Sequence, residues 1–584
     1  EPLSVHRGQI CLNGIWEFVP MLNKVETEPP PGVAYIRVPG SWKPSWPMPG
    51  LVSEKGKGPA WKNWENGSIS WCAGYQRKVK VPAQWAGRAI LVSLERVGTD
   101  AIVYADGTKC GTIAWPYGEV DISKAVKAGN DAVLWIQVMA TSDAAPSESF
   151  LDPGRVVTTS ANLASKGLIG DVFLRSRPSG AHVSDIFVQT STRKRELKLD
   201  IEVSDLTATG PVQFTAKLVD ANGMEQRRFH GEARMNGNET QVVQLAWNWD
   251  DPRLWDFQQP HLYTLKLEAK GTGWEDEYAQ PFGFREFWID GRRFFLNGTE
   301  IRLRPTSHGY METCFGGSIE LTDAHLDGCM YAGFNCEECW PVNHNKKGSV
   351  NFRELWADRA DRKGFLLIGT ALPIDAGQWT KPGYQRSHAR KLERELRRYR
   401  NHPSIVIWTT NPNWLGNGLD QDPRYIGRSE TEAIAHTLED WKKVAAEGAV
   451  VAIKKLDPTR PVLNHAGAYH GDIYNINCYL NLSPLQEREE WLSEWAKSGN
   501  MPLMCVEFGT PWKYTFLQGR WGFEASTESM ATEYCAIYFG PDAHATETAD
   551  YRQAIRKNYR GRQQFGDMGA NWNTFIDALP CLLY

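Results

Sequence analysis

The chain has 584 residues, of which 42% are hydrophobic and 23% are charged, as in ordinary soluble globular proteins. A chain of this length is too long for one core and predicts about three or four domains. The formal net charge of -4 and the lack of a Lys/Arg block argue against nucleic acid as a partner. No segment approaches the roughly 20 apolar residues of a membrane span, so no membrane partner is expected.

Aromatic and cysteine residues give weaker signals. The chain holds 25 Trp and 20 Tyr, whose flat faces suit stacking on sugar rings, although most such residues fill cores. The 11 Cys residues show no disulfide framework, and the CxxC motif of Cys336 and Cys339 has no second Cys or His pair at ligand spacing. The histidines form no recognised ligand spacing either. We therefore expect no metal and no cofactor.

The first 180 residues have the pattern of an all-β domain. Short alternating or β-branched segments at 75–81, 90–94 and 132–138 are separated by turns such as Ala105-Asp-Gly107. Short strands at this spacing predict a β-sandwich or jelly roll over residues 1–180.

Residues 181–288 have the pattern of a second β domain. Apolar residues at every second position from Leu197 to Val203 alternate with charged residues. Asn222-Gly223 supplies a hairpin turn after the segment 214–219. This pattern predicts a half-buried, immunoglobulin-like β-sandwich.

From residue 289 to the end of the chain, strands and helices alternate. We expect eight strands, at about 300–305, 333–339, 365–370, 403–409, 461–465, 473–478, 502–507 and 568–573. We expect helices between them at about 319–332, 350–363, 384–400 and 430–456, with another capped by Ser483. Eight alternations predict a (β/α)8 TIM barrel over residues 289–584. Since the chain stops at Tyr584, soon after the eighth strand, either the natural protein continues or the barrel closes in an unusual way.

One stretch of the barrel region stands out as a catalytic candidate. The apolar run from Met501 ends abruptly in the carboxylate of Glu507, and Gly509 and Pro511 follow. A buried parallel strand delivers an acid to the rim of a barrel in this way. The plainer interpretation of Glu507 is an acid that pairs with an Arg at a strand end.

The carboxyl ends of all barrel strands meet at one rim, so residues far apart in the sequence are expected to face one another there. These residues are acids, amides, histidines and indoles, a set that suits a polyhydroxylated ligand: His308, Glu337, Glu338, Trp340, Asp375, Asn411, Asn413, Trp414, His465, His470, Asn477, Tyr479, Glu507, Trp572 and Asn573.

Several segments together resemble glycoside hydrolase family 2, the group of β-galactosidases, β-glucuronidases and β-mannosidases. Landmarks similar to its sugar-binding domain follow one another in order at Leu12-Asn-Gly-Ile-Trp16, Tyr75-Gln-Arg77, Val81-Pro-Ala-Gln-Trp85, Val103-Tyr-Ala-Asp-Gly107 and Gly167-Leu-Ile-Gly-Asp-Val-Phe-Leu174. Pro260-His-Leu-Tyr-Thr-Leu265 and Phe282-Gly-Phe-Arg285 resemble its last strands before the barrel. The resemblance implies that Glu507, in Val506-Glu-Phe-Gly509, is the catalytic nucleophile.

The fourth strand departs from the family pattern. His402-Pro-Ser-Ile-Val-Ile-Trp408 is present, but the family's Asn-Glu pair, which carries the acid/base, falls on Pro412-Asn413. Asn413 cannot donate a proton with carboxylic-acid strength. Glu338 stands where the family usually has an Arg, and neighbouring carboxylates favour the protonated form that a general acid needs. We therefore expect Glu338 to supply the acid or base, with Asp375, Asp420 and Asp422 as alternatives; Glu338 bonded to an Arg or to substrate hydroxyls is an equally open interpretation.

The remaining rim residues are expected to bind substrate. We place His308, Trp340, Asp375, Asn411, Asn413, Trp414, His470, Tyr479 and Trp572 in this pocket. His402 begins the fourth strand, so it belongs to the opposite end of the barrel, where a structural role is expected.

The sequence therefore predicts a glycosidase that cleaves a β-linked bond in an oligo- or polysaccharide, with Glu507 as nucleophile or base and with a non-standard acid. The alternative is a carbohydrate-binding pseudoenzyme that has lost the family acid/base at Asn413. A carbohydrate is the expected partner, and a homo-oligomer is possible. Location stays open: a role in polysaccharide degradation favours a secreted or periplasmic protein, whereas the many Cys residues favour the cytoplasm.

Overall fold

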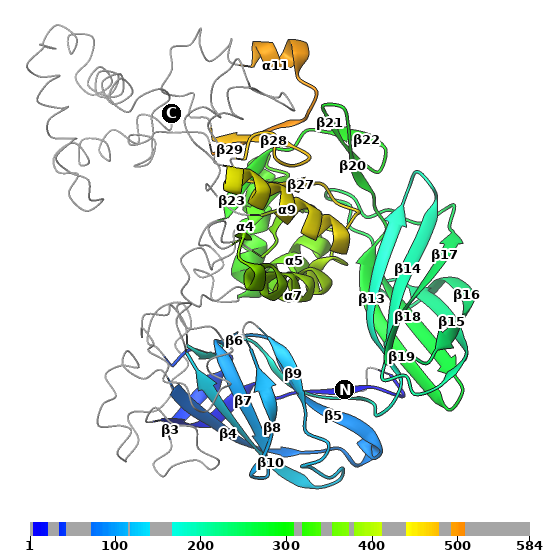
Figure 1. The fold of residues 1–584 in the computed structure, drawn as a ribbon, viewed down its shortest axis with the longest axis vertical. Helices are drawn as coiled ribbons and strands as arrows, with labels where there is room; N and C mark the ends of the chain where they lie inside the picture. The colour runs from blue at the N-terminus through cyan, green and yellow to red at the C-terminus, as the bar shows by residue number, and fades with distance from the viewer. Residues whose placement is uncertain are drawn as a thin grey trace, which may run out of the picture. The chain divides into compact units, whose positions relative to one another are not determined.

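A computed structural model describes residues 4–21, 34–42, 72–114, 117–140, 166–308, 318–339, 353–372, 379–410, 440–465, 467–477 and 492–507 (Figure 1). The chain divides into two compact units. The first comprises Glu1–Trp288, Phe295–Pro373 and Arg390–Ile407, and the second comprises Ile289–Phe294, Ile374–Ala389 and Trp408–Tyr584. Among the described helices, none combines the length and the apolar character that crossing a membrane requires.

The first part of unit 1 is an antiparallel β-sandwich. One sheet has the order β1-β12-β5-β9, with β1 Gly8–Cys11, β12 Val172–Pro178, β5 Arg88–Leu94 and β9 Gly118–Asp121. The other has the order β3-β2-β4-β10-β7-β8, with β3 Ala34–Val38, β2 Gly14–Pro20, β4 Cys72–Lys80, β10 Asp131–Met139, β7 Asp100–Ala105 and β8 Thr108–Ile113. β6 Val97–Gly98 pairs with β11 Gly167–Leu168, and a short 3-10 helix covers Ala83–Trp85. The strands expected at 75–81, 90–94 and 132–138 are confirmed.

Apolar side chains from both sheets fill one core between them. Trp16, Phe18 and Tyr75 are fully buried in this core, and the rings of Phe18 and Tyr75 meet edge to face with centroids 5.3 Å apart. This arrangement is the β-sandwich that the alternating pattern predicts.

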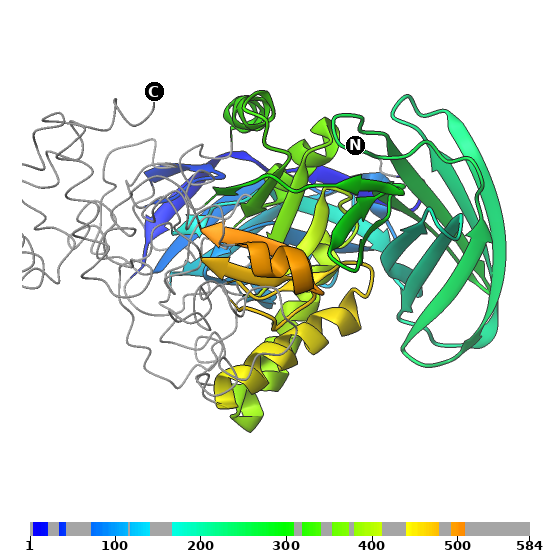
Figure 2. The ribbon, with the colours of Figure 1, turned by 90° about the horizontal axis from the view of Figure 1, so that it is seen from above.

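A second sandwich follows, also within unit 1. Its two sheets have the orders β13-β14-β17 and β16-β15-β18-β19. Figure 2 shows these strands in cyan to green: β13 His182–Ser191, β14 Glu196–Ser204, β15 Thr209–Val219, β16 Glu225–Asn236, β17 Thr240–Asn248, β18 Leu262–Gly271 and β19 Trp274–Gly283. Leu197, Leu199, Ile201 and Val203 are fully buried, as their alternation predicts. The expected hairpin turn is also confirmed, since Gly223 has φ of 78° between β15 and β16.

Parallel strands and helices begin after a small antiparallel sheet of β20 Phe287–Asp290, β21 Arg293–Leu296 and β22 Thr299–Ile301. In unit 1 the strands run β23 Pro305–His308, β24 Cys336–Cys339, β25 Leu366–Thr370 and then β26 Ile405–Thr409. Helix α4 Ile319–Tyr331 precedes β24, and α5 Arg353–Lys363 precedes β25. Ser318 begins α4, because its Oγ accepts a hydrogen bond from the Leu321 N–H.

The chain passes into unit 2 within β26. There Trp408 and Thr409 pair with β27 Val462–Leu463, and β28 Tyr474–Asn477 pairs in parallel with β29 Leu503–Glu507. Helices α7 Pro382–Tyr399, α9 Asp440–Leu456 and α11 Ser493–Ser498 belong to the same alternating segment. Six of the eight expected strands, from 333–339 to 502–507, therefore exist in the described part of the chain; the eighth, at 568–573, and the helix start at Ser483 lie outside it.

The prediction for the first parallel strand, at 300–305, was wrong. Asn297 and Gly298 have φ of 53° and 93° and turn the chain back, so that β22 continues the small antiparallel sheet. β23 begins only at Pro305 and pairs in parallel with β24. The apolar signal around Ile301 thus comes from a hairpin rather than from a parallel strand.

The end of α7 is fixed to both sandwiches within unit 1. Arg398 forms an ion pair with Glu95 of the first sandwich. Arg397 and Arg400 both pair with Asp185 of the second sandwich, and Asn401 accepts a hydrogen bond from the backbone N–H of Val188. Because these residues directly precede β26, the contacts fix the start of that strand.

Candidate active-site strands and a buried His-Cys-Glu cluster

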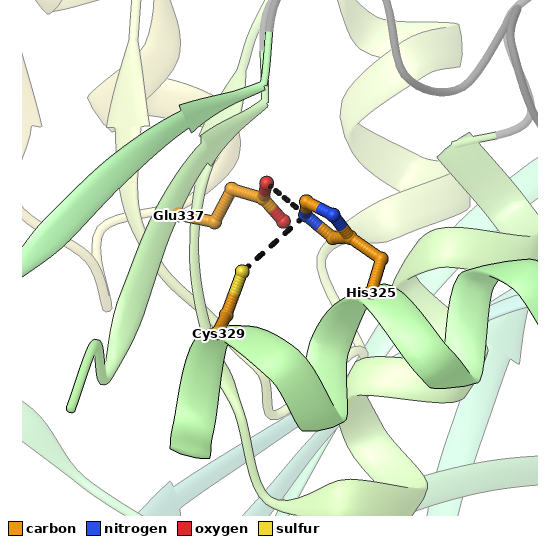
Figure 3. A group of neighbouring side chains, drawn as sticks. All are labelled: His325, Cys329 and Glu337. Carbon is orange, nitrogen blue, oxygen red and sulfur yellow. Dashed lines mark hydrogen bonds and ion pairs between the residues drawn. The ribbon is translucent and has the colours of Figure 1, made fainter. Parts of the chain in front are cut away.

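The two adjacent acids of β24 have different environments. Glu337 has no exposed surface, and its carboxylate points toward His325 of α4 (Figure 3). Oε1 lies 2.8 Å from Nε2 of His325, and Oε2 accepts a 3.0 Å hydrogen bond from Nε1 of Trp356. Glu337 therefore faces the helices that pack on this strand.

Glu338 points to the opposite face of β24, because successive side chains of a strand alternate. It is 4% exposed, and in the register of the parallel strands it lies beside Ile368 of β25. The face turned away from the helices of such strands is the one that lines the interior of a barrel. Of the two acids, Glu338 is thus the one on the face turned away from α4 and α5.

His325 and Cys329 stand one turn apart on α4, where His325 contacts the carboxylate of Glu337 and Cys329 contacts the imidazole of His325 (Figure 3). Sγ of Cys329 lies 3.4 Å from Nε2 of His325, the atom that also contacts Glu337. Burial disfavours the imidazolium, but the contacts with Cys329 and Glu337 outweigh it and raise the pKa of His325 to about 10. The three donor atoms lie within 4.8 Å of one another, an arrangement that could hold a metal ion.

The CxxC motif does not form a comparable donor pair. Cys336 and Cys339 are both buried, but three positions apart on a strand they face opposite sides of the sheet. Burial, with the charges of Glu337 and Glu338 nearby, raises the pKa of the Cys336 thiol. Every cysteine in the described ranges is free of disulfides, these two included.

In unit 2, β29 ends at Glu507, as the sequence predicts. It runs parallel to β28 in the register Tyr474 to Leu503, with an irregularity that brings Asn477 opposite Glu507. The backbone therefore places Glu507 at the carboxyl end of a parallel strand, beside the last residue of the preceding one. The side chains of Glu507 and Asn477 lie outside the described part of the structure.

The ends of β26 and β27 are joined by buried polar groups. Thr410 Oγ donates a hydrogen bond to Oδ1 of Asn464, and Nδ2 of Asn464 donates to the backbone oxygen of His470. Thr410, Asn464 and His465 are all about 1% exposed. Asn464 and Thr410 were not among the expected site residues. Neither is a charged residue at the end of an apolar run, which is the signal that singled out Glu507.

His470 lies against helix α9. Its Nδ1 is 3.8 Å from Oε1 of Glu447, its ring centroid is 4.3 Å from that of Tyr469, and its side chain is 1% exposed. Burial and the nearby charge of Lys443 lower the pKa of His470 to about 4. Among the described residues no hydrogen-bond partner faces its Nε2. A substrate-binding role for His470 stays a prediction.

The other expected site residues fall largely outside the description. Residues Trp340, Asp375, Asn411, Asn413, Trp414, Asp420, Asp422, Tyr479, Trp572 and Asn573 lie outside the described ranges, and for His308 only the backbone, at the end of β23, is described. His402 does lie at the start of β26, where its Nδ1 is 2.6 Å from Oδ2 of Asp361.

Sequence reasoning missed His325 and Cys329 as members of a cluster with Glu337. The i, i+4 spacing of a His and a Cys on a predicted helix was the available signal. That spacing alone does not indicate a site, since the carboxylate comes from a separate strand.

Two segments match known protein families. Residues 181–285 match Glycosyl hydrolases family 2, and residues 368–527 match the TIM barrel domain of Glycosyl hydrolases family 2. The first segment is the second sandwich, and the second includes β25 to β29.

Curated relatives and a solved structure agree with these matches. The chain is 26% identical to a protein named Beta-galactosidase BoGH2A from Bacteroides ovatus, over 68% of this chain and 47% of that protein. It is 26% identical to a putative beta-glucuronidase from Formosa agariphila, over 65% of this chain and 44% of that protein. The chain thus spans about half the length of these relatives.

The fold is similar to that of Bifidobacterium dentium beta-glucuronidase, solved with coumarin-3-O-glucuronide. The TM-score is 0.61 at 19% identity, covering 87% of this chain and 85% of that one. The two sandwiches, the parallel strands and both family matches follow one another in the order that the sequence predicts. The second sandwich and the parallel strands are therefore those of a glycosyl hydrolase family 2-like protein.

Proposed function

We propose that this protein is a β-glycosidase that hydrolyses a β-galactoside or a β-glucuronide. The proposal rests on one observation above the rest: β29 ends on Glu507, the residue that the family resemblance assigns as nucleophile, within the segment that matches the family's TIM barrel domain. The names of the relatives, beta-galactosidase and beta-glucuronidase, support these two substrate classes.

In the proposed reaction Glu507 attacks the anomeric carbon while the bond to the leaving oxygen breaks. The leaving oxygen takes a proton from a carboxylic acid, and the same group later removes a proton from the water that releases the sugar. Since Asn413 cannot supply this proton, we assign the acid/base role to Glu338. Its buried position on the face of β24 that is turned away from α4 and α5 supports this assignment.

Glu337 is unsuited to the same role. Both of its carboxylate oxygens already contact His325 and Trp356, and it has no exposed surface. A substrate oxygen would have to replace a charged partner inside the protein to reach it. Only one of the two neighbouring acids is therefore a candidate.

The second candidate function is a carbohydrate-binding protein without hydrolytic activity. The feature that favours it is Asn413, which stands where the family resemblance places the acid/base. In that case Glu338 and Glu507 would bind sugar hydroxyl groups, and neither would transfer a proton or form a covalent bond.

The test compares leaving groups of different acidity. Phenyl and 2,4-dinitrophenyl β-galactosides and β-glucuronides are offered to the wild type, Glu507→Gln and Glu338→Gln, with Glu232→Gln on the exposed face of β16 as the matched control. A dinitrophenolate leaves without protonation, whereas a phenolate needs an acid. We expect Glu338→Gln to slow cleavage of the glycosidic bond in the phenyl glycosides by roughly 10²–10⁴-fold. Cleavage of the same bond in the dinitrophenyl glycosides should slow far less. Glu507→Gln should abolish turnover of both.

Azide rescue then separates the roles. With Glu338→Ala, azide should attack the glycosyl-enzyme, restore turnover and give the β-glycosyl azide. With Glu507→Ala, azide should attack the substrate itself and give the α-glycosyl azide. If Glu338→Gln slows both leaving groups equally, or not at all, the assignment of Glu338 is wrong. If the wild type binds these sugars but turns over none, the binding-protein function replaces the proposal.

A further inference from the structure

Two different donor atoms converge on a single nitrogen beside β24. Nε2 of His325 lies 2.8 Å from Oε1 of Glu337 and 3.4 Å from Sγ of Cys329 (Figure 3). An imidazole nitrogen carries at most one proton, so Nε2 cannot donate a separate hydrogen bond to each of these atoms. A nitrogen, a thiol sulfur and a carboxylate oxygen thus lie within 4.8 Å of one another.

We propose that His325, Cys329 and Glu337 bind one divalent transition-metal ion of the zinc class. Imidazole nitrogen, thiolate sulfur and carboxylate oxygen are the three kinds of ligand that Zn²⁺ takes in proteins. Hard ions such as Mg²⁺ and Ca²⁺ prefer oxygen ligands, so the thiolate selects against them. The site is separate from the glycosidase function, because Glu337 faces the helices and Glu338 the opposite side.

The distances agree with an ion-free form of such a site. For tetrahedral zinc with ordinary bond lengths, the nitrogen and the oxygen stand ~3.4 Å apart, and the nitrogen and the sulfur ~3.6 Å apart. The two pairs are 2.8 Å and 3.4 Å apart here, so the ion requires the nitrogen and the oxygen to separate by about 0.6 Å and the nitrogen and the sulfur by about 0.2 Å. Rotation of the side chains about their χ angles can supply a movement of this size.

The elements that carry the ligands are held in place by independent contacts. His325 and Cys329 are one turn apart on α4, which directs both side chains to the same face. Arg359 of α5 forms a two-armed ion pair with Asp323 of α4, with N–O distances of 2.7 Å. Two ligands therefore come from one helix that is fixed to its neighbour.

The carboxylate is oriented by a group that does not itself bind the ion. Trp356 is 1% exposed, and its indole N–H donates a hydrogen bond to Oε2 of Glu337. The other oxygen of this carboxylate, Oε1, faces His325. Outer partners of this kind fix the geometry of metal ligands in proteins. Three protein ligands leave one position of a tetrahedral ion for a water molecule.

The alternative is a metal-free ion pair between His325 and Glu337. The two interpretations differ in the role of Cys329: an ion pair does not require the thiol, whereas a metal site requires its thiolate. The decisive measurement must therefore report on a bond between sulfur and metal rather than on stability.

The absorption spectrum of bound Co²⁺ reports on such a bond. In a zinc site with a thiolate ligand, Co²⁺ shows a sulfur-to-metal charge-transfer band, and it shows intense visible bands when it is tetrahedral. Protein stripped with a chelator and kept reduced is titrated with Co²⁺, and then with Zn²⁺ as a competitor. We expect one Co²⁺ per chain, a thiolate band that saturates with it, and loss of the band when Zn²⁺ is added. The same band should be absent in Cys329→Ser and in His325→Gln.

The controls exclude other thiols and unfolded protein. Cys110 is a partly exposed free cysteine and Cys11 an exposed one, so Cys11→Ser with Cys110→Ser serves as the matched background that should keep the band. The titration of the wild type tests the proposal even if a variant fails to fold. Absence of a saturable thiolate band in the wild type, its loss in the Cys11 and Cys110 background, or its survival in Cys329→Ser overturns the proposal.

Discussion

Nε1 of Trp356 donates a 3.0 Å hydrogen bond to Oε2 of Glu337, which joins α5 to β24 through two side chains that are 1% and 0% exposed. The first prediction removes this donor. Trp356→Phe keeps a ring in the core but removes the indole donor from a buried carboxylate oxygen, which costs about 1–3 kcal/mol. Urea unfolding followed by circular dichroism should show this loss.

The matched control for this substitution is Trp441→Phe, since Trp441 is 38% exposed on α9. It should shift the unfolding transition much less. If a metal occupies the neighbouring site, Trp356→Phe should also weaken Co²⁺ binding by roughly 10–100-fold. Equal effects of the two substitutions on unfolding would contradict the role given to the Trp356 hydrogen bond.

The second prediction concerns the start of β26. Asp361 accepts the Ser404 N–H at 2.9 Å and contacts His402 at 2.6 Å. Asp361→Asn removes the charge that pairs with His402 and should lower the free energy of unfolding by about 1–3 kcal/mol. Because these residues lie at the amino end of the strand, kcat of any hydrolysed glycoside should stay unchanged. Asp358→Asn, on the exposed side of α5, is the control, and a selective loss of kcat would speak against a structural role for Asp361.

The third prediction concerns the contact between α7 and the second sandwich. Asp185 pairs with Arg397 and Arg400, and burial raises its pKa despite these two cations. Asp185→Ala leaves two mostly buried guanidinium groups without this partner and should cost about 3–5 kcal/mol. Limited proteolysis together with urea unfolding measures the loss. Asp131→Ala removes an exposed pair with Lys78 and should have a much smaller effect; comparable losses would refute a special role for the α7 contact.

The fourth prediction concerns acid stability. The pKa of His470 falls from 6.5 to about 4 on folding, chiefly through burial. Between these pH values the unfolded chain binds a proton that the folded chain does not, so stability is full above pH 6.5 and declines as the pH falls toward 4. The decline from this group is at most about 3 kcal/mol.

His470→Asn removes the titrating ring and should flatten this part of the stability profile. Urea unfolding at several pH values between 4 and 8 checks the slope, with the value at pH 8 as the reference for any loss of packing. An unchanged slope in the variant would show that other groups control acid stability in this range.

Much of the order of elements could be predicted from the sequence. Residues 197–203 alternate because one face of their strand is buried, and β29 ends at Glu507 because an apolar run stops at a carboxylate. The predicted helix at 319–332 agrees with α4 to within a residue. The first parallel strand was misplaced, because a hairpin at Asn297 and Gly298 has the same local pattern as a strand connection.

The sequence by itself determined the family, the order of the sandwiches and parallel strands, and the position of Glu507, because turns, periodicity and motifs are local properties of the chain. Only the tertiary structure decided that Glu337 faces α4 and α5 while Glu338 faces the other side. All four residues of β24 are buried, so no alternation of polar and apolar residues marks its two faces. For the same reason only the packing of α4 on β24 could bring His325 and Cys329 to Glu337.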